Sequence, residues 1–415
     1  MKFFYALIIS SILFSGCSDE QPKEKISSNL LVEGSWVLHF KLDENQNIPA
    51  KFNLNKIGEN YQLEFVNADE KIAIKAVEIN QKKITIKDPI FNTWFEGKII
   101  NESTIKGFWY KNDKSYKIPF TATHNGGERF PKPTKIEPSD KNISGRWEVD
   151  FSKNNPSDHY KAIGQFAQEG NYLTGTFMTE TGDYRYLEGN FYNDSAYLSC
   201  FDGAHLFMFK AALKNDSLYG TFWSGTHWEE PWVAGRNETF ELRNPDSLTF
   251  LKEGYDKLAF TFPDLKGNNV SLTDEKYQNK VVIVNIMGPW CPNCKDETAY
   301  LTQLYKNNKD KGLEIIALSF DKSEEYESAK NTALKIKEHF SVEYDILIAG
   351  KASKIEAAKA LPMLNHIMSY PTSIFIDKKG NIRKIRTGFY GPGTGEFYNR
   401  YIEQTDDFVA KLLAE

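Results

Sequence analysis

The spacing of apolar residues changes once along the chain, near residue 250, and this change limits the fold that each part can form. From residue 31 to about 240, apolar and polar residues alternate in short runs such as KITIK and HLFMFK. A period of two is typical of half-buried β-strands. From residue 258 onward, apolar runs such as VVIVNI and LEIIALSF alternate with helical stretches, which indicates an α/β layer fold. We therefore expect a multidomain chain with an N-terminal all-β region and a C-terminal α/β domain.

The all-β region contains a repeat. The tripeptide GSW at residue 34 returns as GRW at residue 145, and NESTIKGFWY returns as NDSLYGTFW at a similar distance downstream. We expect two related meander units, residues 30–124 and 142–244, each a barrel or a sandwich. The G-x-W opening resembles that of small lipocalin-like or avidin-like barrels. The Gly- and Pro-containing stretch between the units, residues 124–141, cannot continue a β ladder and is expected to form a linker or a long turn.

Aromatic residues gather near the end of the second unit, at Trp223, Trp228 and Trp232, with His227 among them. Aromatic walls with a few polar groups are typical of a ligand pocket. The β region would then be a binding module for a glycan, a peptide or a small ligand, with the C-terminal domain serving that cargo. Aromatic side chains also fill the cores of strand-rich folds, and packing is the preferred interpretation here.

Residues 1–16 have the pattern of an export signal. Lys2 precedes an almost wholly apolar stretch, residues 3–14, which is too short to span a bilayer. Small residues follow and abut Cys17, which resembles the lipobox of bacterial lipoproteins, with Phe14 in place of the more usual leucine. The resemblance implies that Cys17 carries lipid at the new N-terminus. The alternative is an ordinary cleaved signal with an incidental cysteine.

Residues 17–29 are polar and are expected to form a flexible tether between this anchor and the fold. Their acidic start resembles that of Bacteroidetes-type surface lipoproteins. We expect a lipid-anchored protein of the cell envelope, on the periplasmic side of a membrane or at the cell surface. A net charge of -5, with basic residues spread among the acidic ones, provides no basic face for a polyanion, so nucleic acid is not an expected partner.

Cys291 and Cys294 follow the run VVIVNI and open an expected helix. A zinc site commonly uses two cysteine pairs, but Cys17 belongs to the signal and Cys200 stands alone, so no metal is expected. Haem attachment needs histidine directly after the second cysteine, where Lys295 stands. A structural disulfide across so short a loop would constrain the unfolded chain little. Electron transfer suits the position, because the amino end of a helix stabilises a thiolate and the second sulfur lies one turn inward.

The run VVIVNIMGPWCPNCKDE, followed by SYPTSIFIDKKGNI, resembles the thioredoxin-like thiol:disulfide oxidoreductases of the TlpA and ResA type. The resemblance spans residues 257–415 and includes FTFPDLKGNNVSLTD. It implies a thioredoxin-like fold for these residues. It also implies that Glu297 tunes the thiols, and that Tyr370 and Pro371 form a loop with a cis peptide bond beside Cys291.

Two side chains near the cysteines have more than one interpretation. Trp290 directly precedes Cys291 and is expected at the rim that faces substrate; the alternative is a packing role. Glu297 shares a helical face with apolar residues, so we expect it to be at least partly buried, with a raised pKa. It is then a candidate proton acceptor for Cys294, and the alternative is a solvated helix glutamate.

These features predict an exported, lipid-anchored thiol:disulfide oxidoreductase that needs no bound cofactor. Cys291 would attack a disulfide in a partner protein, and Cys294 would then close the Cys291–Cys294 bond. The expected partners are disulfide-containing exported proteins and a membrane thiol-disulfide electron donor, because a dithiol in an oxidising compartment must be kept reduced. The alternative is a peroxide-reducing enzyme, whose signature has Thr or Ser three residues before the active cysteine and Pro seven before, where Gly288 and Val284 stand.

Overall fold

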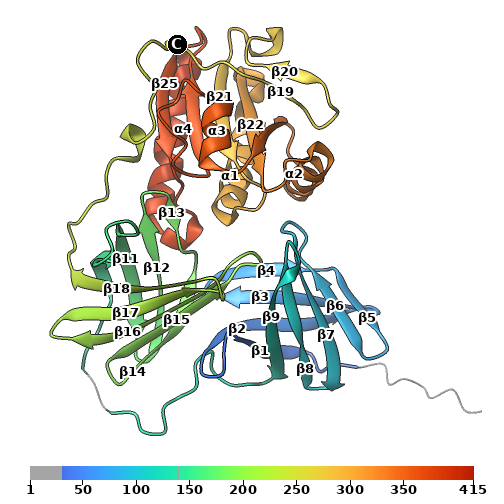
Figure 1. Cartoon of the computed structure of the whole chain (residues 1–415), viewed down its shortest axis with the longest axis vertical. Coiled ribbons are helices and arrows are strands. Elements are labelled where there is room, and N and C mark those ends of the chain that lie inside the picture. The colour runs from blue at the N-terminus through green and yellow to red at the C-terminus, as the bar shows by residue number, and fades with distance from the viewer. Residues whose placement is uncertain (1–29, 138–139) are drawn as a thin grey trace, which may run out of the picture.

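The computed structural model describes residues 30–137 and 140–415, so the expected signal, the tether and Cys17 lie outside the described residues. Two all-β units lie side by side, and an α/β unit lies across them (Figure 1). The prediction of an all-β region followed by an α/β domain is confirmed.

The first unit is an antiparallel sheet of nine strands, ordered β4-β3-β2-β1-β9-β8-β7-β6-β5. Alternate side chains of its strands are buried, as the period of two predicts. The strands are β1 (Gly34–Lys41), β2 (Asn47–Ile57), β3 (Asn60–Asn67), β4 (Glu70–Ile74), β5 (Val77–Asn80), β6 (Lys83–Lys87), β7 (Thr93–Asn101), β8 (Thr104–Lys111) and β9 (Asp113–His124).

The second unit is a closed barrel. Its strands β10, β11, β12, β14, β15, β16, β17 and β18 pair in a ring that the pairing of β11 with β12 completes. Aromatic side chains such as Phe177 and Phe209 stack inside it, so its interior is a packed core. The strands are β10 (Gly145–Phe151), β11 (Tyr160–Glu169), β12 (Tyr172–Thr179), β13 (Gly182–Asp183), β14 (Leu187–Tyr192), β15 (Ser195–Phe201), β16 (Leu206–Lys214), β17 (Ser217–Ser224) and β18 (Trp228–Arg236).

The repeat is visible at the two tryptophans. The indole N–H of Trp36 donates to the carbonyl oxygen of Val32 at 3.0 Å, and that of Trp147 donates to Ile143 at 2.9 Å. Both side chains are buried, and in both units the glycine two residues earlier has a positive φ. The two units therefore begin with the same local structure.

The aromatic group of the second unit divides into two sets. Trp232 is buried in the barrel core and Trp223 packs, partly buried, against the core of the first unit, as the packing interpretation predicts; Cys200 is also buried in the barrel core. Trp228 is 43% exposed, so the packing interpretation is wrong for this residue. The reason is its position at the first residue of β18, at the end of the barrel, where the interior opens.

Beyond His124, the last residue of β9, the described part of the stretch between the units, residues 125–137 and 140–141, forms no strand, as predicted, but part of it is packed against both sheets. Arg129 is buried, and its guanidinium donates to the carboxylate of Glu188 at 2.7 Å and to the hydroxyl of Ser199 at 3.3 Å. It also donates to the carbonyl oxygen of Val66 in the first sheet. The linker therefore connects the two β units through a buried cation.

The α/β unit has a five-stranded sheet in the order β23-β22-β21-β24-β25, with a small hairpin of β19 and β20 beside it. Alternate residues of β21 enter two different cores, one under α1, α2 and α4 and the other under α3, so both sheet faces are covered. The strands are β19 (Thr261–Pro263), β20 (Asn269–Ser271), β21 (Val281–Met287), β22 (Leu313–Asp321), β23 (Asp345–Lys351), β24 (Thr372–Ile376) and β25 (Ile382–Thr387). The helices are α1 (Pro292–Asn308), α2 (Tyr326–Phe340), α3 (Lys354–Ala360) and α4 (Glu396–Ala414).

The three units meet at Arg185, just after β13. Its side chain is 2% exposed and forms ion pairs with Glu70 of the first unit at 2.6 Å and with Asp296 of α1. A third carboxylate, that of Asp202 in the barrel, lies 3.7 Å from its Nε. We call Arg185 and these three carboxylates the three-unit junction.

Replacing Arg185 with methionine should strongly destabilise the protein, because three carboxylates would keep their buried positions without a cation. The expected loss in the free energy of unfolding is about 3–5 kcal/mol, the usual cost of breaking a buried ion pair on one side. Denaturant unfolding of the full chain measures it. Arg243→Met is the control, since Arg243 is mostly exposed and pairs with Glu180 at the surface. Equal stability of the two variants would show that the three-unit junction contributes no more than a surface ion pair.

Candidate functional site

Cys291 lies between the end of β21 and the first turn of α1. It is the N-cap of the helix, and its sulfur accepts a hydrogen bond from the backbone N–H of Cys294 at 3.2 Å. Pro292 takes the first helical position, where the missing N–H removes no intrahelical bond. The free N–H groups and the dipole at this end of the helix stabilise negative charge on the capping atom. The helix itself therefore holds the Cys291 sulfur at the amino end of α1.

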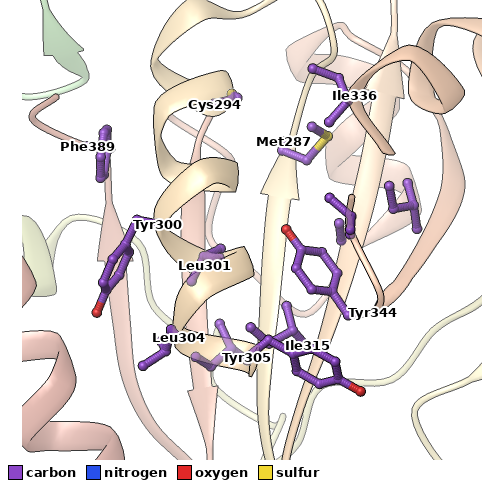
Figure 2. Packing of buried hydrophobic residues seen from close by; sticks show 14 of the residues in the cluster. Met287, Cys294, Tyr300, Leu301, Leu304, Tyr305, Ile315, Ile336, Tyr344 and Phe389 are labelled. Atoms are coloured by element: carbon purple, nitrogen blue, oxygen red, sulfur yellow. The ribbon is translucent and has the colours of Figure 1, made fainter. Parts of the chain in front are cut away.

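Cys294 lies beneath Cys291 in the core. The exposed fraction is 7% for Cys291 and 0% for Cys294, and neither forms a disulfide. Burial, together with the neighbouring Cys291 sulfur, raises the pKa of the Cys294 thiol well above its ordinary value. Figure 2 shows Cys294 on α1, in the same cluster of buried side chains as Met287 at the end of β21. Solvent thus reaches the first sulfur before the second.

The loop before β24 contacts Cys291. The peptide bond between Tyr370 and Pro371 is cis, as the resemblance implies. The Cys291 thiol donates to the carbonyl oxygen of Tyr370 at 3.3 Å. The ring of Tyr370 packs edge-on against Trp290 with 5.6 Å between centroids, and the indole N–H of Trp290 donates to the carbonyl oxygen of Phe320 at 3.0 Å. Trp290, Tyr370 and Pro371 therefore gather around Cys291.

Glu297 is 1% exposed, on the buried side of α1. Burial raises the pKa of its carboxyl, and hydrogen bonds from three neighbours oppose the shift. The donors are Tyr401 at 2.7 Å, Asn285 at 2.6 Å and Ser373 at 3.0 Å. The carboxylate is near enough to Cys294 to contribute to the raised pKa of that thiol. The expectation that Glu297 is buried is confirmed, and the alternative of a solvated glutamate is wrong.

The β units cover the cysteine motif. Asn293, between the two cysteines, donates to the carboxylate of Asp183 in β13 at 3.1 Å and to the carbonyl oxygen of Phe389 at 3.0 Å. The same Asp183 carboxylate accepts the backbone N–H of Gly391 at 2.7 Å. Ile90 and Phe91 of the first unit belong to the same buried cluster as Cys291. The site is therefore built by all three units.

A metal has no evident place at this site. Among residues 30–137 and 140–415, no group of three or more His, Cys, Asp or Glu side chains is arranged to hold a metal ion.

Within the same ranges, no helix is both long enough and apolar enough to cross a membrane.

Comparison with known proteins places the α/β unit in a family. The AhpC/TSA family matches residues 255–385. The thiol-disulfide oxidoreductase ResA of Geobacillus kaustophilus is 31% identical over 144 residues, which are 35% of this chain and 72% of that protein. ResA of Bacillus cereus strain ZK / E33L is 34% identical over 145 residues, 35% of this chain and 73% of that protein. The chain belongs to the ResA-like thiol-disulfide oxidoreductases.

A solved thioredoxin domain of a thiol-disulfide oxidoreductase from Bacteroides vulgatus is 28% identical to this oxidoreductase. The match covers 39% of this chain and 99% of the solved domain, with a TM-score of 0.29. Each of these relatives covers little more than a third of the chain. The relatives therefore leave the greater part of this oxidoreductase unmatched.

Several residues of the site carry no signal that sequence reasoning could use. Asn285 and Ser373 sit within apolar strand runs, and Tyr401 lies far along the chain in α4, yet all three contact Glu297. Asp183 and Arg185 of the barrel contact Asn293 and Asp296, which lie more than a hundred positions further along the chain. An isolated polar residue inside a buried strand, such as Asn285, is the one clue available, because a buried amide needs a partner.

Iodoacetamide should alkylate Cys291 faster than Cys294 or Cys200 in the reduced protein. Cys291 combines the helix-capping position with an exposed fraction of 7%, whereas Cys294 and Cys200 are fully buried and burial raises the pKa of both thiols well above the ordinary value. Peptide mapping after brief labelling measures the three rates. Faster labelling of Cys294 would reverse the order of attack that the geometry indicates.

Proposed function

We propose that this oxidoreductase is exported, is anchored to the cell envelope by lipid on Cys17, and reduces disulfides of partner proteins through Cys291 and Cys294. The observation that carries the proposal is the placement of the Cys291 sulfur as the cap of α1, directly above a fully buried second thiol. The export signal of the sequence supports the location, on either the periplasmic side of a membrane or the cell surface.

The reaction follows from the position of the two sulfurs. The Cys291 thiolate attacks one sulfur of the partner disulfide, that S–S bond breaks, and the leaving sulfur takes up a proton. Cys294 then loses its proton and attacks the Cys291 sulfur, which releases the second partner sulfur as a thiol. Two electrons and two protons pass to the partner, and the protein is left with a Cys291–Cys294 disulfide. Exchange with a membrane dithiol donor restores the reduced state.

Glu297 is the proposed proton acceptor for Cys294. A thiol with a strongly raised pKa needs a base at the moment when it attacks, and Glu297 is the acidic group beneath it on the same helix. Trp290, Tyr370 and Pro371 are the proposed contacts for the partner segment around its disulfide. Their position around Cys291 supports this role.

The proposed domain limits keep the sequence boundaries. The export signal is residues 1–16 and the tether 17–29; the β units are residues 30–124 and 142–244, and the thioredoxin-like domain is residues 257–415. The antiparallel sheets of the β units give way to the mixed sheet of the α/β unit, and this change supports the last of these limits.

The alternative of peroxide reduction is less well supported. A Cβ at Gly288 would lie 2.6 Å from the indole nitrogen of Trp290, so the Thr or Ser of the peroxiredoxin signature does not fit without displacing that ring. Val284, where that signature has proline, pairs within the central strand of the sheet.

Cys294→Ala should trap partner proteins covalently on Cys291, because the mixed disulfide then has no internal thiol to resolve it. Non-reducing gels of cells that carry this variant should show adducts that vanish on reduction. Cys200→Ala is the matched control, since Cys200 is buried in the barrel core and should trap nothing. An absence of adducts with Cys294→Ala would contradict the proposed exchange.

The direction of electron flow needs a separate measurement. Thiol trapping of the wild-type protein in living cells should find the cysteine pair mostly reduced while the membrane donor is present, and oxidised when it is deleted. A pair that is mostly oxidised in both strains would indicate an oxidase or isomerase.

Glu297→Gln should slow closure of the Cys291–Cys294 bond by roughly 10²-fold, as expected for loss of a general base. In the wild type, closure should accelerate as pH rises through the raised pKa of Glu297, and the variant should lack this step. Stopped-flow release of a chromogenic thiol from the mixed disulfide measures it. Glu403→Gln, an exposed change on α4, is the control. Unchanged closure in Glu297→Gln would exclude a proton-transfer role.

A further inference from the structure

A cavity of about 890 Å³ lies where the end of the barrel faces the α/β unit. Trp290, which directly precedes Cys291, and Met368 line it from the α/β unit. Tyr184 and Trp228 line it from the barrel, and Lys111 from the first β unit. Its volume falls in the range of about 300–1,000 Å³ that holds a small ligand or a short peptide. The cavity therefore borders the redox motif and has walls from all three units.

The barrel side of the cavity is aromatic, with polar groups that are already paired. The hydroxyl of Tyr160 donates to the buried carboxylate of Glu230 at 2.7 Å and lies 2.7 Å from the hydroxyl of Tyr184. Ser152 donates to the other oxygen of Glu230 at 2.7 Å. The second carboxylate of the wall, Glu180, accepts from Arg243 at 2.5 Å. Neither of these two acids forms an ion pair with Lys111 or Lys322.

Two lysines near Trp290 form no ion pair among the described residues, although the charge of Asp202 acts on Lys111 and that of Asp321 on Lys322. The ammonium of Lys111 donates to the carbonyl oxygen of Ala204 at 2.6 Å, and that of Lys322 lies 5.4 Å from the ring centroid of Trp290. Neither forms an ion pair with any residue that the structure describes. Burial, and after it the charge of Lys322, lowers the pKa of Lys111 to about 8. Two partly buried cations that repel each other form a site suited to an anion.

The cover over Cys291 restricts what can approach it. A smaller cavity of about 280 Å³ also has Trp290 in its wall and shares Lys111, Trp290 and Lys322 with the larger one. Ile90 and Phe91 pack in the same cluster as Cys291 and are also part of the wall of the smaller cavity. A flat protein surface cannot pass such walls, whereas a small or extended molecule fits between them.

We propose that the cavity is the substrate site of this oxidoreductase, and that the preferred substrate is a small or extended disulfide with a carboxylate next to its sulfur. Lys111 and Lys322 bind the carboxylate, and the aromatic wall of the barrel packs against the rest of the molecule. This inference rests on the proposed disulfide-reducing function. Two sources share the chemistry, namely an oxidised low-molecular-weight thiol and an acidic segment of an unfolded partner protein.

The test compares two disulfides on the reduced full-length protein. Oxidised glutathione carries carboxylates, and bis(2-hydroxyethyl) disulfide carries none. The double change Lys111→Gln with Lys322→Gln should lower kcat/KM for oxidised glutathione by about tenfold or more, as expected for loss of charge-assisted contacts, and leave the neutral disulfide within about twofold. Glutamine keeps a donor for the carbonyl of Ala204. Lys106→Gln, an exposed change on the same strand as Lys111, should alter neither rate.

The outcomes separate this inference from the function on which it rests. The wild-type protein could reduce both disulfides while the double variant loses kcat/KM equally for both. That result would overturn the inference alone. A protein that reduces neither would overturn the proposed function and the inference with it. A six-residue peptide disulfide with aspartate beside its cysteine distinguishes the sources: a kcat/KM above that of oxidised glutathione assigns the site to a protein segment, and a lower value assigns it to a small thiol.

Discussion

The buried charge of Arg185 sets the arrangement of this molecule. A guanidinium removed from water is tolerated only where carboxylates compensate for its lost hydration, and here one carboxylate comes from each of the three units. No unit can move away without leaving a buried charge unpaired. Because Asp296 lies two residues beyond Cys294, the same ion pairs that hold the β units together also hold them against the redox helix. The covered motif and the cavity beside it both depend on this cluster of charges.

Features that depend on neighbouring residues in the sequence were predictable. The period of two predicted the strands, the repeated G-x-W predicted two units that begin alike, and the position of Cys291 after an apolar run predicted its place at the start of a helix. Each depends on backbone conformation over a few residues, which local side chains control.

Features that depend on distant residues were not predictable. Arg185 contacts Asp296 across 111 positions and Glu70 across 115, and no spacing rule links them. The net charge of the whole chain also does not predict the charge of a single cavity wall. A net charge of -5 disfavours a polyanionic partner, yet folding brings Lys111 and Lys322 into one cavity wall, where neither lysine forms an ion pair with a described residue. Trp228 lies outside the core for a similar reason, since the sequence alone does not show that this residue begins a strand at the end of the barrel.

The capping hydrogen bond between Cys291 and Cys294 has a consequence for the energetics of oxidation. A sulfur in a disulfide carries no charge and is a weaker acceptor than a thiolate, so the first turn of α1 loses part of its cap when the bond forms. Whatever the cap contributes to the reduced state raises the reduction potential, by about 30 mV for each 1.4 kcal/mol. Burial raises the pKa of the Cys294 thiol, so that sulfur stays protonated in the reduced state and adds no comparable effect of charge. The strength of this protein as a reductant is therefore linked to one backbone hydrogen bond at the start of α1.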